Sequence, residues 1–191
     1  FWLGQKGMKK MRYRAKVIRL KDGREATLRS PEITDASALL GYLKETAADT
    51  PFLLRTPEEC TMTLEEEERY LEKALSSEDK VMILCEIDGI IAGNCQIDRK
   101  NRKKTRHRAM LGIAIVKEFW GLGIGTEMFR EMIRLGREMG LRQLELEVIE
   151  GNERALGLYH KMGFSITGEK PDAICLSDGT MLKEYYMVRK L

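Results

Sequence analysis

The segment from Ala109 to Thr126 constrains the fold of this chain more than any other. It reads AMLGIAIVKEFWGLGIGT: an apolar run typical of a strand, a short turn, and glycines at positions 121, 123 and 125 that open a helix. A helix begins with unpaired backbone N–H groups and the positive end of its dipole, which together hold a phosphate. Glycine lets the backbone approach such an anion closely, because it has no Cβ and tolerates positive φ. The segment therefore predicts a site for a phosphate-bearing cofactor.

Two known phosphate-binding patterns fit this segment poorly. A dinucleotide fingerprint is favoured by Glu145 and Glu147, which lie on a following strand about 20 residues past the glycines. However, the third fingerprint glycine is missing, and too little chain remains for a doubly wound sheet. A P-loop is excluded because no Gly-Lys-Ser/Thr follows. A purely structural role of the glycines, as a tight turn from strand to helix, stays open at this point.

Length and composition indicate one ordinary globular domain. The chain has 191 residues, of which 43% are hydrophobic and 33% charged. Its net charge of +3 argues against general nucleic-acid binding, and no apolar run predicts a membrane span or a signal peptide. The 4 cysteines show no Cys-x-x-Cys pairing and there are 2 histidines, so we expect no metal site, a reducing compartment and a cytoplasmic protein.

The chain is divided into a domain over residues 12–191 and an N-terminal extension over residues 1–11. Because the sequence starts with Phe1, residues 1–7 are interpreted in part as residues left by cloning or processing, with Met8 or Met11 as a native start. Nothing in the composition divides the rest of the chain further.

Local patterns predict an α/β fold, in which a mixed, largely antiparallel sheet carries helices on both faces. The expected strands cover residues 17–20, 26–29, 81–87, 90–97, 110–116, 141–148, 164–167 and 185–189, and the expected helices cover residues 35–47, 63–75, 126–139 and 152–162. A loop around Pro171 is expected between the last two strands. The basic stretch Arg99–Arg108 is interpreted as a solvated hairpin tip.

The second expected helix, TLEEEERYLEKAL, begins with an acidic run. Leu64, Tyr70, Leu71 and Leu75 are expected to line part of the core. The run Glu65–Glu68 is interpreted as a solvated helix start near the positive end of the dipole, in preference to a polyamine-binding site.

A second pattern, NERALGLYHKMGF, lies near the C-terminal end of the chain. Together with the glycine segment, it resembles the two best-known signatures of the Gcn5-related N-acetyltransferase superfamily, and the element order is similar from about residue 14 onward. The first signature, Gln/Arg-x-x-Gly-x-Gly/Ala, matches at Gly123 and Gly125, with Trp120 in place of Gln/Arg. The second signature, Asn-x-x-Ala-x-x-x-Tyr-x-x-x-Gly-Phe, matches at Asn152, Ala155, Tyr159, Gly163 and Phe164.

The resemblance implies a single-domain fold in which two central strands splay apart, here at Gly112–Val116 and Leu146–Ile149. It also implies acetyl-CoA as a co-substrate, and no metal. The amides of Leu122–Thr126 would hold the pyrophosphate, and Asn152 would contact the pantetheine arm, although a plain helix N-cap explains this residue equally well. The cofactor-binding residues implied are Ile113, Ile115, Val116, Gly121, Leu122, Gly123, Ile124, Gly125, Thr126 and Asn152.

The reaction implied by the resemblance is direct attack of an amine on the thioester. An amine with a pKa near ~10 must lose a proton before it attacks, and the departing thiolate leaves more easily when an acid protonates it. Tyr159 is the implied acid, with a packed ring as the alternative role. Glu147, twelve residues earlier, resembles in its spacing the proposed base of the ribosomal-protein alanine acetyltransferases, with a hydrogen bond to the main chain as the alternative role. Other carboxylates held in reserve are those of Glu86, Asp98 and Glu150.

The acceptor is expected to be a primary amine on a small molecule or a protein N-terminus. Its pocket is expected between residues 39 and 75 and the C-terminal hairpin, with Phe52, Leu53 and Tyr70 as candidate lining residues. A non-catalytic acyl-CoA-binding sensor and a longer acyl donor stay open as alternatives. No nucleic-acid or membrane partner is expected, and a homodimer stays open because dimers are common in similar proteins.

Overall fold

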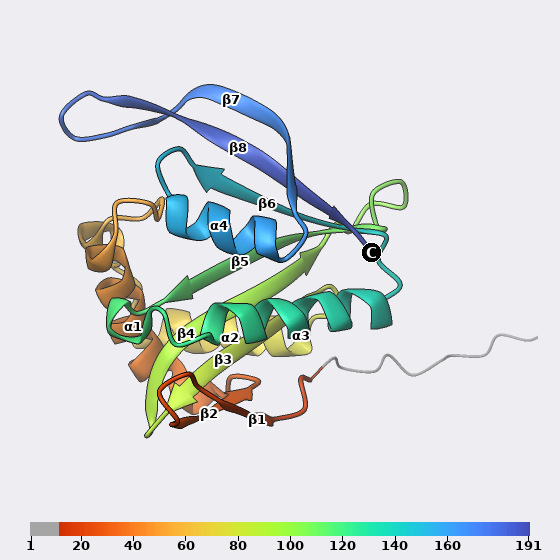
Figure 1. The fold of residues 1–191 in the computed structure, drawn as a ribbon. Coiled ribbons are helices and arrows are strands. Elements are labelled where there is room, and N and C mark those ends of the chain that lie inside the picture. The colour runs from red at the N-terminus through yellow and green to blue at the C-terminus, as the bar shows by residue number, and fades with distance from the viewer. Residues whose placement is uncertain (1–11) are drawn as a thin grey trace, which may run out of the picture.

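The computed structural model describes residues 12–191, so the expectations for residues 1–11 lie outside the described residues. An eight-stranded sheet carries helices on both faces (Figure 1). The strands are β1 (Lys16–Arg19), β2 (Glu25–Arg29), β3 (Lys80–Ile87), β4 (Ile90–Arg99), β5 (Arg108–Ile115), β6 (Gln143–Ile149), β7 (Ser165–Cys175) and β8 (Met181–Lys190). The helices are α1 (Ala36–Asp49), α2 (Leu64–Ser76), α3 (Ile124–Glu138) and α4 (Glu153–Lys161).

The sheet is interrupted near its centre, between β5 and β6. The strand order is β1-β2-β3-β4-β5-β6-β8-β7, and β5 and β6 form the parallel pair in an otherwise antiparallel sheet. These two strands pair only where Arg108–Met110 lies beside Gln143–Glu145. Beyond that point β5 continues to Ile115 and β6 to Ile149 without pairing to each other. The predicted splayed pair of central strands is therefore confirmed.

The apolar side of α3 closes the core on one face of the sheet. Met128, Phe129 and Met132 are fully buried, as expected for a stripe of apolar residues at helical spacing. Cys85 and Cys95 are also fully buried, where a free cysteine behaves as a small apolar side chain. Among residues 12–191, no helix is long and apolar enough to cross a membrane.

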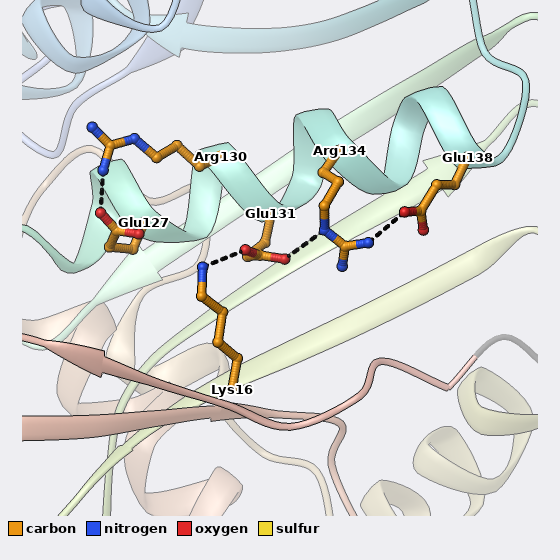
Figure 2. A network of polar contacts seen from close by, with 6 residues as sticks. All are labelled: Lys16, Glu127, Arg130, Glu131, Arg134 and Glu138. Atoms are coloured by element: carbon orange, nitrogen blue, oxygen red, sulfur yellow. Dashed lines mark hydrogen bonds and ion pairs between the residues drawn. The ribbon is translucent and has the colours of Figure 1, made fainter.

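The outer side of α3 carries a row of ion pairs that ties the helix to β1 (Figure 2). Glu131 is only 5% exposed, and it accepts hydrogen bonds from Lys16 Nζ at 2.8 Å and from Arg134 Nε at 2.9 Å. Although burial alone would raise the pKa of Glu131, the hydrogen bonds from Lys16 and Arg134 hold that pKa below its ordinary value. Glu131 is thus a buried carboxylate whose charge is compensated within the fold.

Two local expectations are wrong. The loop expected around Pro171 belongs to β7, where the ladder with β8 is irregular between Lys170 and Ile174; proline is tolerated there because β7 lies at the sheet edge. On α2, Leu64 is 46% exposed, whereas Glu67 of the acidic run is 3% exposed. The side of α2 that packs inward therefore includes a carboxylate and omits the first leucine.

Candidate active site

The splayed strands leave backbone groups of β5 open to a ligand. The Val116 N–H donates to the Ala92 carbonyl of β4 at 3.0 Å. Successive residues of a strand direct their backbone groups to opposite edges, so those of Ile113 and Ile115 point away from β4 and toward the split. The Ile115 carbonyl accepts a hydrogen bond from Trp120 Nε1 at 2.7 Å. The Ile113 amide and carbonyl are therefore the groups best placed to pair with an extended chain that enters the split.

The glycine segment forms an uncapped helix start beside this split. Gly121 and Gly123 have φ values of 80° and 95°, which glycine adopts without strain. No side chain caps α3, so the amides of its first turn keep their capacity for an anion. The turn is held to the β1–β2 hairpin, because the Lys21 amide donates a hydrogen bond to the Leu122 carbonyl at 3.1 Å. This geometry fits a phosphate.

Gly125 has a different role from its two neighbours. A Cβ at this position would lie 2.8 Å from Leu158 Cδ2 on α4, closer than side chains normally approach. Gly125 therefore lets α3 and α4 pack closely, which is a structural role different from the predicted tight turn between strand and helix.

A recess of about 460 Å³ extends from the split to the start of α3. Its lining includes eight of the ten predicted cofactor residues: Ile113, Ile115, Gly121, Gly123, Ile124, Gly125, Thr126 and Asn152. Lys21 and Arg154 add positive charge to its wall, and the Arg154 guanidinium stacks 4.6 Å from the centre of the Trp120 ring. The uncapped amides, the open strand edge and these cations together suit a long ligand with phosphate at one end and amides along its chain.

The other two predicted cofactor residues do not line this recess. Val116 is buried and directs its amide to β4, and the Leu122 carbonyl is taken by Lys21. Asn152 begins α4, where its Oδ1 accepts a hydrogen bond from the Ala155 amide at 3.2 Å. The N-cap role of Asn152 is thus confirmed, and its position in the recess leaves the ligand contact as a prediction.

Tyr159 lies where the recess meets a second cavity, and it lines both. Its ring packs edge-on against Phe129 at 5.4 Å between centroids, and the residue is 8% exposed. No residue within 12–191 forms a hydrogen bond with its hydroxyl. Burial raises the pKa of Tyr159 to about 12, so the phenol stays protonated at neutral pH and can donate a proton or a hydrogen bond.

The second cavity, about 600 Å³, lies between the sheet and the α1–α2 region. Phe52, Leu53 and Tyr70 line it, which agrees with the expected position of the acceptor pocket. Glu147 of β6 also lines it, with an exposed side chain. On β8, Glu184 is buried in the same wall, and its pKa is raised by burial and then by the nearby charge of Glu147.

Glu67 and Arg55 border the same cavity from the α1–α2 region. Glu67 has no hydrogen-bond or ion-pair partner for its carboxylate within residues 12–191, and burial raises its pKa. Arg55 Nη2 donates to Thr46 Oγ1 at 3.0 Å and its Nε donates to the Leu43 carbonyl at 3.4 Å.

The reserve carboxylates are engaged elsewhere. Glu86 pairs with Arg29 at 2.7 Å, and Asp98 with Lys80 at 3.1 Å. Neither of these carboxylates lines the two cavities. Glu150 approaches Lys183 at 4.0 Å, and it is likewise absent from both linings.

Sequence reasoning missed six charged residues that line the site: Lys21, Arg55, Glu67, Glu153, Arg154 and Glu184. Arg154 falls inside the second signature and had a signal that could have been used. Lys21 sits in a hairpin turn and Arg55 in a loop, positions at which no spacing indicates an inward direction. Glu67 could not be distinguished in the sequence from the other glutamates of the run Glu65–Glu68.

Comparison with known proteins agrees with this geometry. Residues 40–164 match the family model described as the acetyltransferase (GNAT) family. An L-amino acid N-acetyltransferase of Escherichia coli (strain K12) is 33% identical over 113 residues, which cover 58% of this chain and 67% of the relative.

Solved structures show the same fold. A GNAT-family acetyltransferase from Streptococcus pneumoniae superposes with a TM-score of 0.82 at 32% identity, covering 87% of this chain and 99% of that one. A phosphinothricin acetyltransferase from Sinorhizobium meliloti, solved in complex with acetyl-CoA, has a TM-score of 0.74 at 20% identity, covering 87% and 88%.

Proposed function

Because the chain belongs to the acetyltransferase (GNAT) family and is an acetyl-CoA-dependent N-acetyltransferase, we propose that it acetylates a small primary amine bound in the cavity of about 600 Å³. The observation that carries the proposal is that this cavity meets the cofactor recess at Tyr159. The name of the E. coli relative, an L-amino acid N-acetyltransferase, supports a small acceptor.

The recess supplies the binding groups for the co-substrate. The first-turn amides of α3 would hold the pyrophosphate, with Lys21 and Arg154 as additional cations. The open edge at Ile113 would pair with the pantetheine amides. When bound, acetyl-CoA supplies the activated acetyl group as a thioester.

The proton transfers are assigned to two residues that line the same cavity, Glu147 and Tyr159. Glu147 takes one proton from the acceptor's ammonium, directly or through water, and passes it to solvent. The neutral nitrogen then bonds to the carbonyl carbon while the carbon–sulfur bond breaks with its electron pair on sulfur. Tyr159 gives its proton to that sulfur and is restored by the second proton that the nitrogen loses.

The first test is a thermal-shift titration with acetyl-CoA, CoA and NADH in parallel. Binding to the folded state alone raises stability by RT ln(1 + [L]/Kd), about 2.7 kcal/mol at one hundred times Kd. We expect both CoA species, but not NADH, to raise the Tm. Absence of a response to either CoA species at millimolar concentration would refute the proposed recess.

The second test follows thiol release with a panel of primary amines. Tyr159→Phe is expected to lower kcat by roughly 10²- to 10³-fold without changing the Kd of CoA. Tyr185→Phe, on the neighbouring β8 and outside both cavities, serves as the matched control. An unchanged kcat in Tyr159→Phe would remove this residue from the mechanism.

A further inference from the structure

The cavity that we assign to the acceptor contains a buried negative charge with no partner. The Glu67 carboxylate is 3% exposed, and no side chain or amide of residues 12–191 bonds to it. Glu184 is also buried in this cavity without a hydrogen-bond or ion-pair partner among residues 12–191, and its pKa is raised by burial and by the like charge of Glu147 more than it is lowered by Lys170, whereas burial alone raises the pKa of Glu67. A buried carboxylate is stabilised when it is paired or neutralised, and a cationic ligand group in the cavity would supply the partner that the described part of the chain does not provide.

Arg55 brings the opposite charge to the same cavity. Its guanidinium is held by the Leu43 carbonyl and the Thr46 hydroxyl, both neutral, and it forms no ion pair with a carboxylate of residues 12–191. Glu67 and Arg55 therefore do not neutralise each other. The α1–α2 region fixes two opposite charges beside one cavity and leaves both available to a ligand.

We infer that Glu67 and Arg55 select a zwitterionic acceptor, a free α-amino acid, whose ammonium pairs with Glu67 and whose carboxylate pairs with Arg55. A free amino acid carries both charges on one carbon, so it bridges opposite charges that do not touch. A simple amine would leave Arg55 unpaired. A protein N-terminus carries an amide in place of the carboxylate and would leave it unpaired too. The inference rests on the proposed function, because it assigns a substrate to the same cavity.

The test compares each L-amino acid with its own α-amide in the thiol-release assay. The pair differs only by the carboxylate, so the ratio of the two kcat/KM values isolates the contribution of Arg55. We expect the wild-type protein to prefer the free acid by about 10- to 100-fold. Arg55→Met is expected to lower kcat/KM for the acid by about that factor, to change the amide little, and so to abolish the preference.

Glu67→Gln is expected to raise KM for the acid and the amide alike by about 10- to 100-fold, because both carry the ammonium. Glu65→Gln, an exposed neighbour on the same helix outside the cavity, is the matched control and should leave both values unchanged. An unchanged KM for acetyl-CoA verifies that each variant is folded. If Arg55→Met does not fold, Arg55→Gln, which also removes the positive charge, is measured in the same way.

Three outcomes would overturn the inference: equal turnover of acid and amide by the wild type, a preference that persists in the Arg55 variant, or an unchanged acceptor KM in Glu67→Gln. A wild-type protein that acetylates amides or peptides well would retain the proposed transferase function and lose only the zwitterionic acceptor. A wild-type protein that does not respond to acetyl-CoA would lose the proposed cofactor recess itself, which the thermal-shift titration reports separately.

Discussion

Two buried glutamates on two helices of this protein differ in whether the fold pairs their charge. On α3, Glu131 is 5% exposed and its carboxylate forms ion pairs with Lys16 and Arg134, so its negative charge is compensated within the fold (Figure 2). On α2, Glu67 is 3% exposed, and its carboxylate forms no hydrogen bond or ion pair with residues 12–191. The first carboxylate stabilises the packing of α3 on β1, and the second opposes the packing of α2. A fold retains such an unfavourable charge where a ligand completes it, so the difference between the two distinguishes scaffold from site.

The largest effect on stability is expected on the scaffold side of this comparison. Glu131→Gln removes a charge that two cations share, and should lower the free energy of unfolding by about 1–2 kcal/mol while leaving kcat unchanged. Chemical denaturation at pH 7 measures it. Glu138→Gln, an exposed partner of the same Arg134, is the control and should cost much less. Equal losses in the two variants would mean that the burial of Glu131 adds nothing.

The opposite sign is expected at the site. Glu67→Gln replaces an unpaired buried carboxylate by a neutral amide, and should raise the free energy of unfolding by about 1 kcal/mol in the absence of ligand. The same denaturation experiment tests this, with Glu65→Gln as the exposed control. A loss of stability in Glu67→Gln would show that the carboxylate is paired in solution, and the contrast with Glu131 would disappear.

The pH dependence should sharpen the contrast further. The folded-state pKa of Glu131 lies below its ordinary value of 4.5, so its contribution to stability is present above that value and is lost as the pH falls through the folded pKa. The folded-state pKa of Glu67 lies above 4.5, so its penalty is absent below pH 4.5 and grows as the pH rises through the folded pKa. Denaturation should be measured for the wild type and for each Gln variant between about pH 3 and 7. The loss of unfolding free energy in Glu131→Gln and the gain in Glu67→Gln should both become smaller as the pH falls.

The smallest effect on stability is expected for Tyr159→Phe. The hydroxyl has no partner within residues 12–191, so removing it should change the free energy of unfolding by less than about 0.5 kcal/mol. Its ring contact with Phe129 is retained. A large loss would indicate that the hydroxyl is a structural group, and its role as the acid would need a different explanation.

The sequence predicted the fold well where local signals carry the information. Strand and helix patterns placed most of the elements, and the resemblance carried by the two signatures implied the splayed strands, the start of α3 and Asn152 at the start of α4. The two helix starts are decided within a few residues of chain. The extension of β7 through Pro171 was missed, because the tolerance of an edge strand for proline depends on the strand order of the whole sheet.

The charges of the acceptor cavity could not be predicted for a related reason. The run Glu65–Glu68 contains both solvated carboxylates and Glu67, and only the docking of α2 against the sheet decides which one points inward. Similarly, Arg55 lies in a loop whose direction is set by contacts with Leu43 and Thr46 on α1. Sequence patterns give the identity of such residues but not their orientation, because tertiary packing determines it.

An unpaired strand edge usually threatens a protein, because it accepts any other extended chain. Here the open edge of β5 lies inside the sheet, and the gap beside it closes where β5 meets β6 at Met110. The β5–β6 pairing would therefore limit how far along β5 an extended ligand paired with this edge could reach, whatever contacts its tip makes.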